Sequence, residues 1–179
     1  MFDLDTFVGD CVTAVADPQP RLAVKEVLDR AVATPDAVAR ALPAERAGIE
    51  RIHVSPELTI IKVVWAPRMR IFPHDHRMWA AIGIYGGQED NTFYRRAPEG
   101  VVASGGTELR ERDVALLGDD TIHAVVNPRD AYTGAIHVYG GDFFTTPRSE
   151  FDPETLAEQP YDVERTMALF EAANATTDV

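Results

Sequence analysis

The chain has 179 residues, of which 45% are hydrophobic, so it is long enough to bury one substantial core and short enough to form a single domain. Its formal net charge of -12 argues against nucleic acid or an anionic membrane as a partner, because both require a basic surface. Cys11 is the one cysteine, which excludes an internal disulfide and a cluster of thiolate metal ligands.

The first residues lack the basic and apolar regions of a secretion signal, and no stretch is long and apolar enough to span a bilayer. We therefore expect a cytoplasmic protein, a monomer or homodimer, whose partners are small molecules or another protein.

The first 45 residues predict helices. Apolar residues recur at helical spacing over 4–15 and again over 22–32, and Pro35 has the character of a third helix start. This part of the chain forms a helical preface to the rest.

From about residue 50 to 145 the pattern changes to short apolar or alternating runs bounded by Gly, Pro, Asn and Asp. The predicted strands are 51–54, 58–65, 80–85, 91–96, 114–117, 122–126 and 134–139. Short strands with tight turns indicate a sandwich or a small barrel. Residues 153–159 and 163–173 predict helices, so the expected domain, 1–179, has a preface over 1–45, a β-barrel over 50–145 and C-terminal helices over 152–175.

The arrangement of the histidines is the most informative pattern in the sequence. His74 and His76 are separated by one residue, and side chains alternate across a β-strand, so both imidazoles would point to the same face. His123 begins a second apolar run, where an unpaired imidazole would be costly to bury. Three imidazoles would cover one face of an octahedral metal site and leave positions for a substrate and for dioxygen or water. A His-x-His pair alone also suits an ordinary strand, but with His123 the pattern favours a catalytic metal site.

Arginines gather near the histidine pair on an otherwise acidic chain. They are Arg51, Arg68, Arg70, Arg77, Arg95 and Arg96. A guanidinium grips a carboxylate with two parallel hydrogen bonds, so this clustering favours a ligand that bears a carboxylate.

The central region, roughly residues 50 to 145, resembles the cupin superfamily of double-stranded β-helix barrels, and within it the thiol dioxygenases typified by cysteine dioxygenase. The resemblance rests on Trp65 and on the stretches 73–76, 123–127 and 137–139. It implies a mainly β fold, a jelly-roll barrel with N-terminal helices and a C-terminal helix. It also implies one Fe(II) ion, although sites of this kind take Ni, Cu or Zn as well.

Cupins usually carry a glutamate ligand three or four residues beyond the second histidine, and here those positions hold Ala80 and Ala81. Glu89 lies too far along the chain to fit that motif. Three neutral imidazoles without a carboxylate are typical of the thiol dioxygenases. They leave Fe(II) with its full double charge, so an anionic ligand is favoured and a bound thiol loses its proton readily.

His137 and Tyr139 lie two residues apart on a predicted strand and share one face. By resemblance, the tyrosine hydroxyl sits beside the substrate and the histidine orients it. The alternative is a buried polar pair satisfied by its neighbours. Where the family often has a serine two residues before this histidine, the chain has Ala135, and the cysteine that animal members crosslink to the tyrosine is absent from 79–82.

Arg51 precedes Trp65 at nearly the distance where cysteine dioxygenases carry the arginine that binds the substrate carboxylate. A surface arginine at the start of a strand explains it equally well, and Arg68, Arg70 and Arg77 are other candidates for the same task.

The resemblance therefore implies an iron-dependent thiol dioxygenase that uses O2 to oxidise a small carboxylate-bearing thiol to its sulfinate. Candidate substrates are cysteine, 3-mercaptopropionate and mercaptosuccinate. The alternatives are a cupin metalloenzyme acting on a carboxylate that is not a thiol, and a metal-dependent sensor that binds small molecules without turnover.

Overall fold

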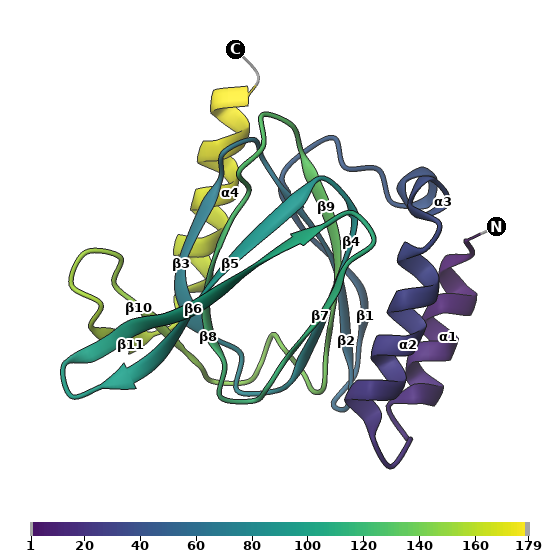
Figure 1. Cartoon of the computed structure of the whole chain (residues 1–179), viewed down its shortest axis with the longest axis horizontal. Helices are drawn as coiled ribbons and strands as arrows, with labels where there is room; N and C mark the ends of the chain where they lie inside the picture. Colours follow the sequence, from purple (N-terminus) through teal and green to yellow (C-terminus); the bar gives the residue numbers. More distant parts are fainter. Residues whose placement is uncertain (1, 178–179) are drawn as a thin grey trace.

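Two antiparallel β-sheets face each other at the centre of the computed structural model, which describes residues 2–177 (Figure 1). The five-stranded sheet has the order β1-β2-β9-β4-β7, and the six-stranded sheet has the order β11-β10-β3-β8-β5-β6. The strands are β1 (Gly48–Val54), β2 (Thr59–Trp65), β3 (Arg70–Asp75), β4 (Ala80–Gly86), β5 (Gln88–Ala97), β6 (Gly100–Arg110), β7 (Val114–Leu117), β8 (Ile122–Val126), β9 (Thr133–Tyr139), β10 (Ser149–Phe151) and β11 (Glu158–Pro160).

Strands β2 to β9 form the barrel. Their order is β2-β9-β4-β7 in one sheet and β3-β8-β5-β6 in the other. The first strand in the sequence thus pairs with the last, β2 with β9, and the second with the second-last, β3 with β8. This is the strand order of an eight-stranded jelly roll. The expected fold class, a mainly β jelly-roll barrel with N-terminal helices and a C-terminal helix, is confirmed.

The helices lie outside this barrel. They are α1 (Leu4–Ala14), α2 (Pro20–Val32), α3 (Pro35–Ala41) and α4 (Val163–Thr177). Helix α1 begins after Asp3, whose carboxylate accepts a hydrogen bond from the Thr6 amide at 2.8 Å. Helices α2 and α3 each begin with a proline, which suits a first turn because the missing N–H would be unpaired there anyway. None of the helices within 2–177 is both long and apolar enough to cross a bilayer.

Helix α2 packs on the outer face of the five-stranded sheet, and α1 packs against α2, on the right in Figure 1. Gly83 of β4 permits the close approach of α2, because an added Cβ there would lie 3.0 Å from Leu28 and from Val32. Both of these aliphatic side chains are fully buried, so α2 shields β4 from solvent on its outer face and leaves the inner face to the barrel interior.

Helix α4 closes the opposite side of the barrel. Phe170 is fully buried in the barrel core and stacks on Trp65, with ring centroids 5.4 Å apart. Burial of one such ring stabilises the fold by about 2–3 kcal/mol. The tryptophan is thereby fixed with its indole N–H inside the barrel.

The helix predicted over 153–159 is wrong. Asp152 accepts hydrogen bonds from the amides of Glu154 and Thr155, which forms a tight turn, and Leu156 has a positive φ of 57°. The chain then returns as strand β11, which pairs with β10 in a short hairpin. The C-terminal part therefore holds one helix, α4.

Four strands, β3, β6, β10 and β11, fall outside the seven predicted runs. Strand β3 contains Pro73, which has no amide hydrogen, and its pairing with β8 is irregular between Ile71 and His74. Strand β6 is an edge strand paired with β5 alone, and β10 and β11 span three residues each, too few for a period of two to be visible.

Candidate metal centre

The six-stranded sheet brings three histidines together on its inner face. His74 of β3 is the direct antiparallel partner of His123 of β8, and His76 follows two residues later, just beyond the end of β3. All three side chains are buried, and their ligand atoms lie within 4.8 Å of one another. Sequence alternation and strand register thus gather the predicted triad at one point.

The ε nitrogens of the triad converge. His76 Nε2 lies 3.3 Å from His74 Nε2 and 3.1 Å from His123 Nε2. Three nitrogens bound at right angles to one ion at about 2.1 Å would be about 3.0 Å apart. The spacing therefore fits three imidazoles that share one divalent metal ion.

Hydrogen bonds orient two of these rings for metal binding. His74 Nδ1 donates to the Phe72 carbonyl at 3.0 Å, and His123 Nδ1 lies 2.6 Å from Asn91 Oδ1. A histidine that donates through Nδ1 leaves the lone pair of Nε2 free for a metal. His76 Nδ1 is buried and has no hydrogen-bond partner in the described part of the chain, and its ring makes an edge contact with Tyr139.

The histidines are electrically neutral at pH 7. Burial lowers the pKa of His74 to about 4 and holds the pKa values of His76 and His123 well below their ordinary range, with the neighbouring imidazoles adding to the effect. Neutral imidazoles with free lone pairs suit Fe, Ni, Cu or Zn, and no carboxylate belongs to this cluster among residues 2–177. The site therefore fits a metal ion with three nitrogen ligands and open positions.

The metal-free protein should lose stability as the pH falls from 6.5 towards 4. The unfolded chain binds protons on its histidines near pH 6.5, whereas the folded chain resists protonation of His74 down to about pH 4. The unfolded state therefore binds more protons in this window, which for His74 corresponds to about 3 kcal/mol. Urea unfolding of the metal-free protein at pH 7.5 and pH 4.5 measures this loss, and an unchanged midpoint would contradict it.

The open side of the triad faces a small apolar cavity. Its volume is about 30 Å³, and its lining includes Tyr139, Phe143 and Tyr161 as well as the triad. This space holds one or two water molecules. A larger ligand needs a displacement of the aromatic side chains at its edge.

A second layer of polar groups lies behind the cavity. The Glu89 carboxylate, fully buried, accepts hydrogen bonds from Trp65 Nε1 at 2.7 Å, from His137 Nε2 at 3.3 Å and from Asn91 Nδ2 at 3.1 Å. His137 Nδ1 lies 3.1 Å from the Tyr139 hydroxyl. Burial alone would raise the pKa of Glu89, but the nearby His137 and the three hydrogen bonds hold it below its usual range. The carboxyl group is therefore an anion.

Arg51 does not line the cavity. It is exposed on β1, and its guanidinium stacks on Phe144 at 3.8 Å from the ring centroid. Of the other candidates, Arg68 pairs with Asp130, Arg77 pairs with Asp75, and Arg70 is exposed.

Among the arginines, Arg148 has the surroundings that best suit the binding of a substrate. Its guanidinium lies between the rings of Phe143 and Tyr161, 4.0 Å from each centroid, and donates through Nη1 to the Phe143 carbonyl. Its Nε is buried and has no hydrogen-bond partner among residues 2–177. Burial is the main reason why the pKa values of His74 and His76 are low, and the positive charge of Arg148 lowers them further. The guanidinium therefore lies close enough to the triad to act on it electrostatically.

Sequence reasoning missed Glu89 and Arg148. Glu89 was considered only as a metal ligand, and the structure indeed leaves it outside the triad, but its burial beside His137 depends on strand pairing. Arg148 lies in the segment between β9 and β10, and the sequence contains no local signal for its position between two rings.

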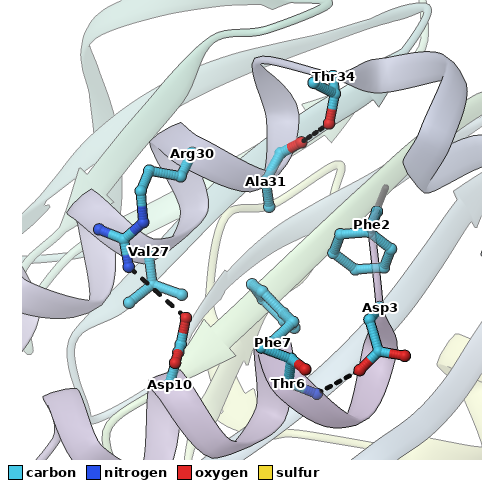
Figure 2. A pocket seen from close by; sticks show the side chains of 9 residues that line it. All are labelled: Phe2, Asp3, Thr6, Phe7, Asp10, Val27, Arg30, Ala31 and Thr34. Carbon is cyan, nitrogen blue, oxygen red and sulfur yellow. Dashed lines mark hydrogen bonds and ion pairs between the residues drawn. The ribbon is translucent and has the colours of Figure 1, made fainter.

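A separate hollow of about 280 Å³ lies on the outside, between α1 and α2 (Figure 2). Its polar groups are paired with one another: Arg30 with Asp10 at 3.7 Å, and Asp3 with the amide of Thr6. It contains no group of metal-ligating side chains, so the barrel interior is the candidate site.

No protein-family model matches the chain, and no curated protein matches it by sequence. Solved structures resemble it in fold. A protein from Bacillus halodurans aligns with a TM-score of 0.51 and 15% identity, over 60% of this chain and 76% of that one. An RmlC-like cupin with a double-stranded β-helix fold from Methanocaldococcus jannaschii aligns at 0.47 and 10%, over 57% and 87%. A cupin superfamily protein from Desulfitobacterium hafniense aligns at 0.46 and 15%, over 59% and 88%.

Proposed function

We propose that this protein is a mononuclear non-haem Fe(II) dioxygenase that oxidises a small carboxylate-bearing thiol to its sulfinate. The observation that carries the proposal is the buried cluster of three neutral histidines without a carboxylate ligand. Such a ligand set leaves the double charge of the metal uncompensated at the open positions, which favours an anionic substrate such as a thiolate. When bound, the iron supplies the redox chemistry that dioxygen activation requires.

The reaction balances without a further reductant. The thiol loses its proton, the O–O bond breaks, and both oxygen atoms bond to sulfur. Sulfur gives up four electrons, which are the four that reduce dioxygen. The barrel contributes an apolar cavity that keeps bulk water away from the reacting atoms.

Arg148 replaces Arg51 as the proposed carboxylate-binding residue. Its Nε carries a buried N–H that has no acceptor among residues 2–177. A substrate carboxylate would accept from Nε and from the parallel N–H of Nη2 with charge-assisted hydrogen bonds, while Nη1 keeps its bond to the Phe143 carbonyl. Arg148 also lines an open groove of about 660 Å³, from which such a ligand could approach.

Tyr139 is proposed to hold a proton beside the substrate. Burial raises the pKa of its hydroxyl, so the group stays protonated, and its ring contacts His76 at 5.0 Å between centroids. Its hydroxyl pairs with His137, which fixes its direction. The tyrosine therefore offers a hydroxyl oxygen of defined orientation near the open side of the triad.

Tyr139→Phe should lower kcat by about 10- to 100-fold while leaving the metal content unchanged, because a positioned proton donor contributes at least this much to a reaction. Steady-state oxygen uptake and metal analysis of the same preparation measure both quantities. Tyr94→Phe, on the outer face of the six-stranded sheet, is the matched control. Equal losses of iron and activity in the Tyr139 variant would contradict the proposed role.

Oxygen uptake by the Fe(II)-loaded protein tests the function directly. The panel contains cysteine, 3-mercaptopropionate, mercaptosuccinate and a thiol without a carboxylate, and mass spectrometry follows the product. We expect uptake equal to the thiol consumed and a gain of two oxygen atoms. Turnover of a carboxylate that is not a thiol would favour another cupin metalloenzyme, and tight binding without uptake would favour a sensor.

A further inference from the structure

A hydrogen-bonded chain centred on Glu89 connects the metal ligand His123 with Tyr139. One carboxylate oxygen, Oε1, accepts from Asn91, whose own carbonyl lies 2.6 Å from His123 Nδ1. The other, Oε2, accepts from Trp65 and from His137. The anion thus lies behind both the ligand set and the tyrosine.

The carboxylate fixes the direction of every hydrogen bond on the ligand side. An ionised carboxylate can only accept, so Asn91 must turn its amide nitrogen towards Glu89 and its carbonyl towards His123. The carbonyl in turn only accepts, so His123 Nδ1 must carry the proton. The lone pair of His123 Nε2 is then free at the metal position.

Glu89 fixes the hydrogen bonds on the tyrosine side as well. His137 Nε2 must donate to the carboxylate, because an ionised carboxylate only accepts. This bond orients the imidazole so that its other nitrogen, Nδ1, lies 3.1 Å from the Tyr139 hydroxyl.

We propose that Glu89 is a positioning residue that sets the tautomer of the ligand His123 through Asn91 and the orientation of the His137 ring beside the Tyr139 hydroxyl. The inference rests on the metal site of the proposed function but not on its substrate. Many metal sites include a carboxylate among the ligands. In this barrel the Glu89 carboxylate lies behind the histidine ligands instead. It supplies negative charge to the centre while the open positions stay free.

Substitution of Glu89 by glutamine makes a sharp test. The single amide oxygen would accept from Trp65 and His137, and the NH2 group would face Asn91, which would have to rotate to present its oxygen. The amide nitrogen of Asn91 would then face His123 Nδ1 and require a lone pair there, which moves the proton to the metal-binding Nε2. We expect Glu89→Gln to weaken metal binding by about 10- to 100-fold.

A second substitution should restore the chain. In the double variant Glu89→Gln/Asn91→Asp, the new aspartate carboxylate accepts from the glutamine NH2 group and from His123 Nδ1, so the ligand recovers its tautomer and the site recovers its charge. Asn91→Asp alone would place two carboxylates in contact and should also weaken metal binding. We expect the double variant to bind metal within about threefold of the native protein, against the 10- to 100-fold loss in the single variant.

Titration of the metal-free proteins with Co(II), followed by visible absorption, measures affinity and ligand field without turnover. Asn174→Ala is the matched control, because this buried amide makes two hydrogen bonds to Ala47 and lies outside the chain of groups described here. It should lower Tm and leave the Co(II) affinity and spectrum unchanged.

Two results would overturn the inference: native Co(II) affinity in Glu89→Gln, or a double variant that binds no better than the single one. Metal binding by the native protein without oxidation of any thiol would overturn the proposed function and leave this inference standing. Failure of the native protein to bind any divalent metal would overturn both.

Discussion

Substitution of His123 by alanine should abolish metal binding and, with it, any turnover. The side chain provides one of the three candidate ligand nitrogens, and the two that remain, those of His74 and His76, come from one short segment. Loss of a partner behind a ligand typically costs about 10- to 100-fold in metal affinity, so loss of the ligand itself should cost more. Metal analysis after dialysis against Fe(II), together with Co(II) titration, measures the change.

The matched control is His53→Ala. His53 lies on β1, half-buried and outside the triad, so its substitution removes an imidazole without touching the site. This variant should keep native metal content and native activity. Full retention of metal by the His123 variant, with native stability, would remove the three-histidine centre and the proposed function that depends on it.

The location of the triad could be predicted because it depends on short-range rules. Alternation along one strand places His74 and His76 on one face whatever the rest of the fold does. His123 was identifiable as a polar group in an otherwise apolar run. The register that sets His123 opposite His74 could not be predicted, because it depends on the irregular pairing around Pro73.

Contacts between residues that lie far apart in the sequence could not be predicted from the sequence. Glu89 and His137 are separated by 48 residues, and their contact exists because β5 and β9 lie in opposite sheets that face each other across the barrel. Motif spacing tests whether a glutamate is a ligand of the metal. It does not test whether a glutamate is buried behind one.

The arginines illustrate the same limit. The sequence offers fifteen of them, and the resemblance to cysteine dioxygenases favoured Arg51, which the structure places on the surface. Arg148 lies beyond the barrel strands, and two aromatic rings fix its position. Such a stack forms only when the segment after β9 folds back towards α4, which no local pattern encodes.

Arg148→Gln should raise KM for a carboxylate-bearing thiol by about 30- to 100-fold, with a smaller change in kcat. The expected size follows from the loss of charge-assisted hydrogen bonds, which are worth about 2–3 kcal/mol together. Arg51→Gln is the matched control, since it removes an exposed guanidinium from the same protein and should leave KM unchanged. Metal content and Tm of both variants separate a binding defect from loss of the aromatic stack.

Comparison of substrates makes this test decisive. A thiol without a carboxylate gains nothing from a guanidinium, so Arg148→Gln should barely change its KM, and the preference for the acid should fall by the same 30- to 100-fold, about 2–3 kcal/mol. If instead Arg51→Gln raised KM for the acid and Arg148→Gln did not, the carboxylate would bind to Arg51, the residue that the resemblance favoured, which stacks on Phe144. An equal loss for both thiols would assign Arg148 to the packing of Phe143 and Tyr161 rather than to substrate recognition.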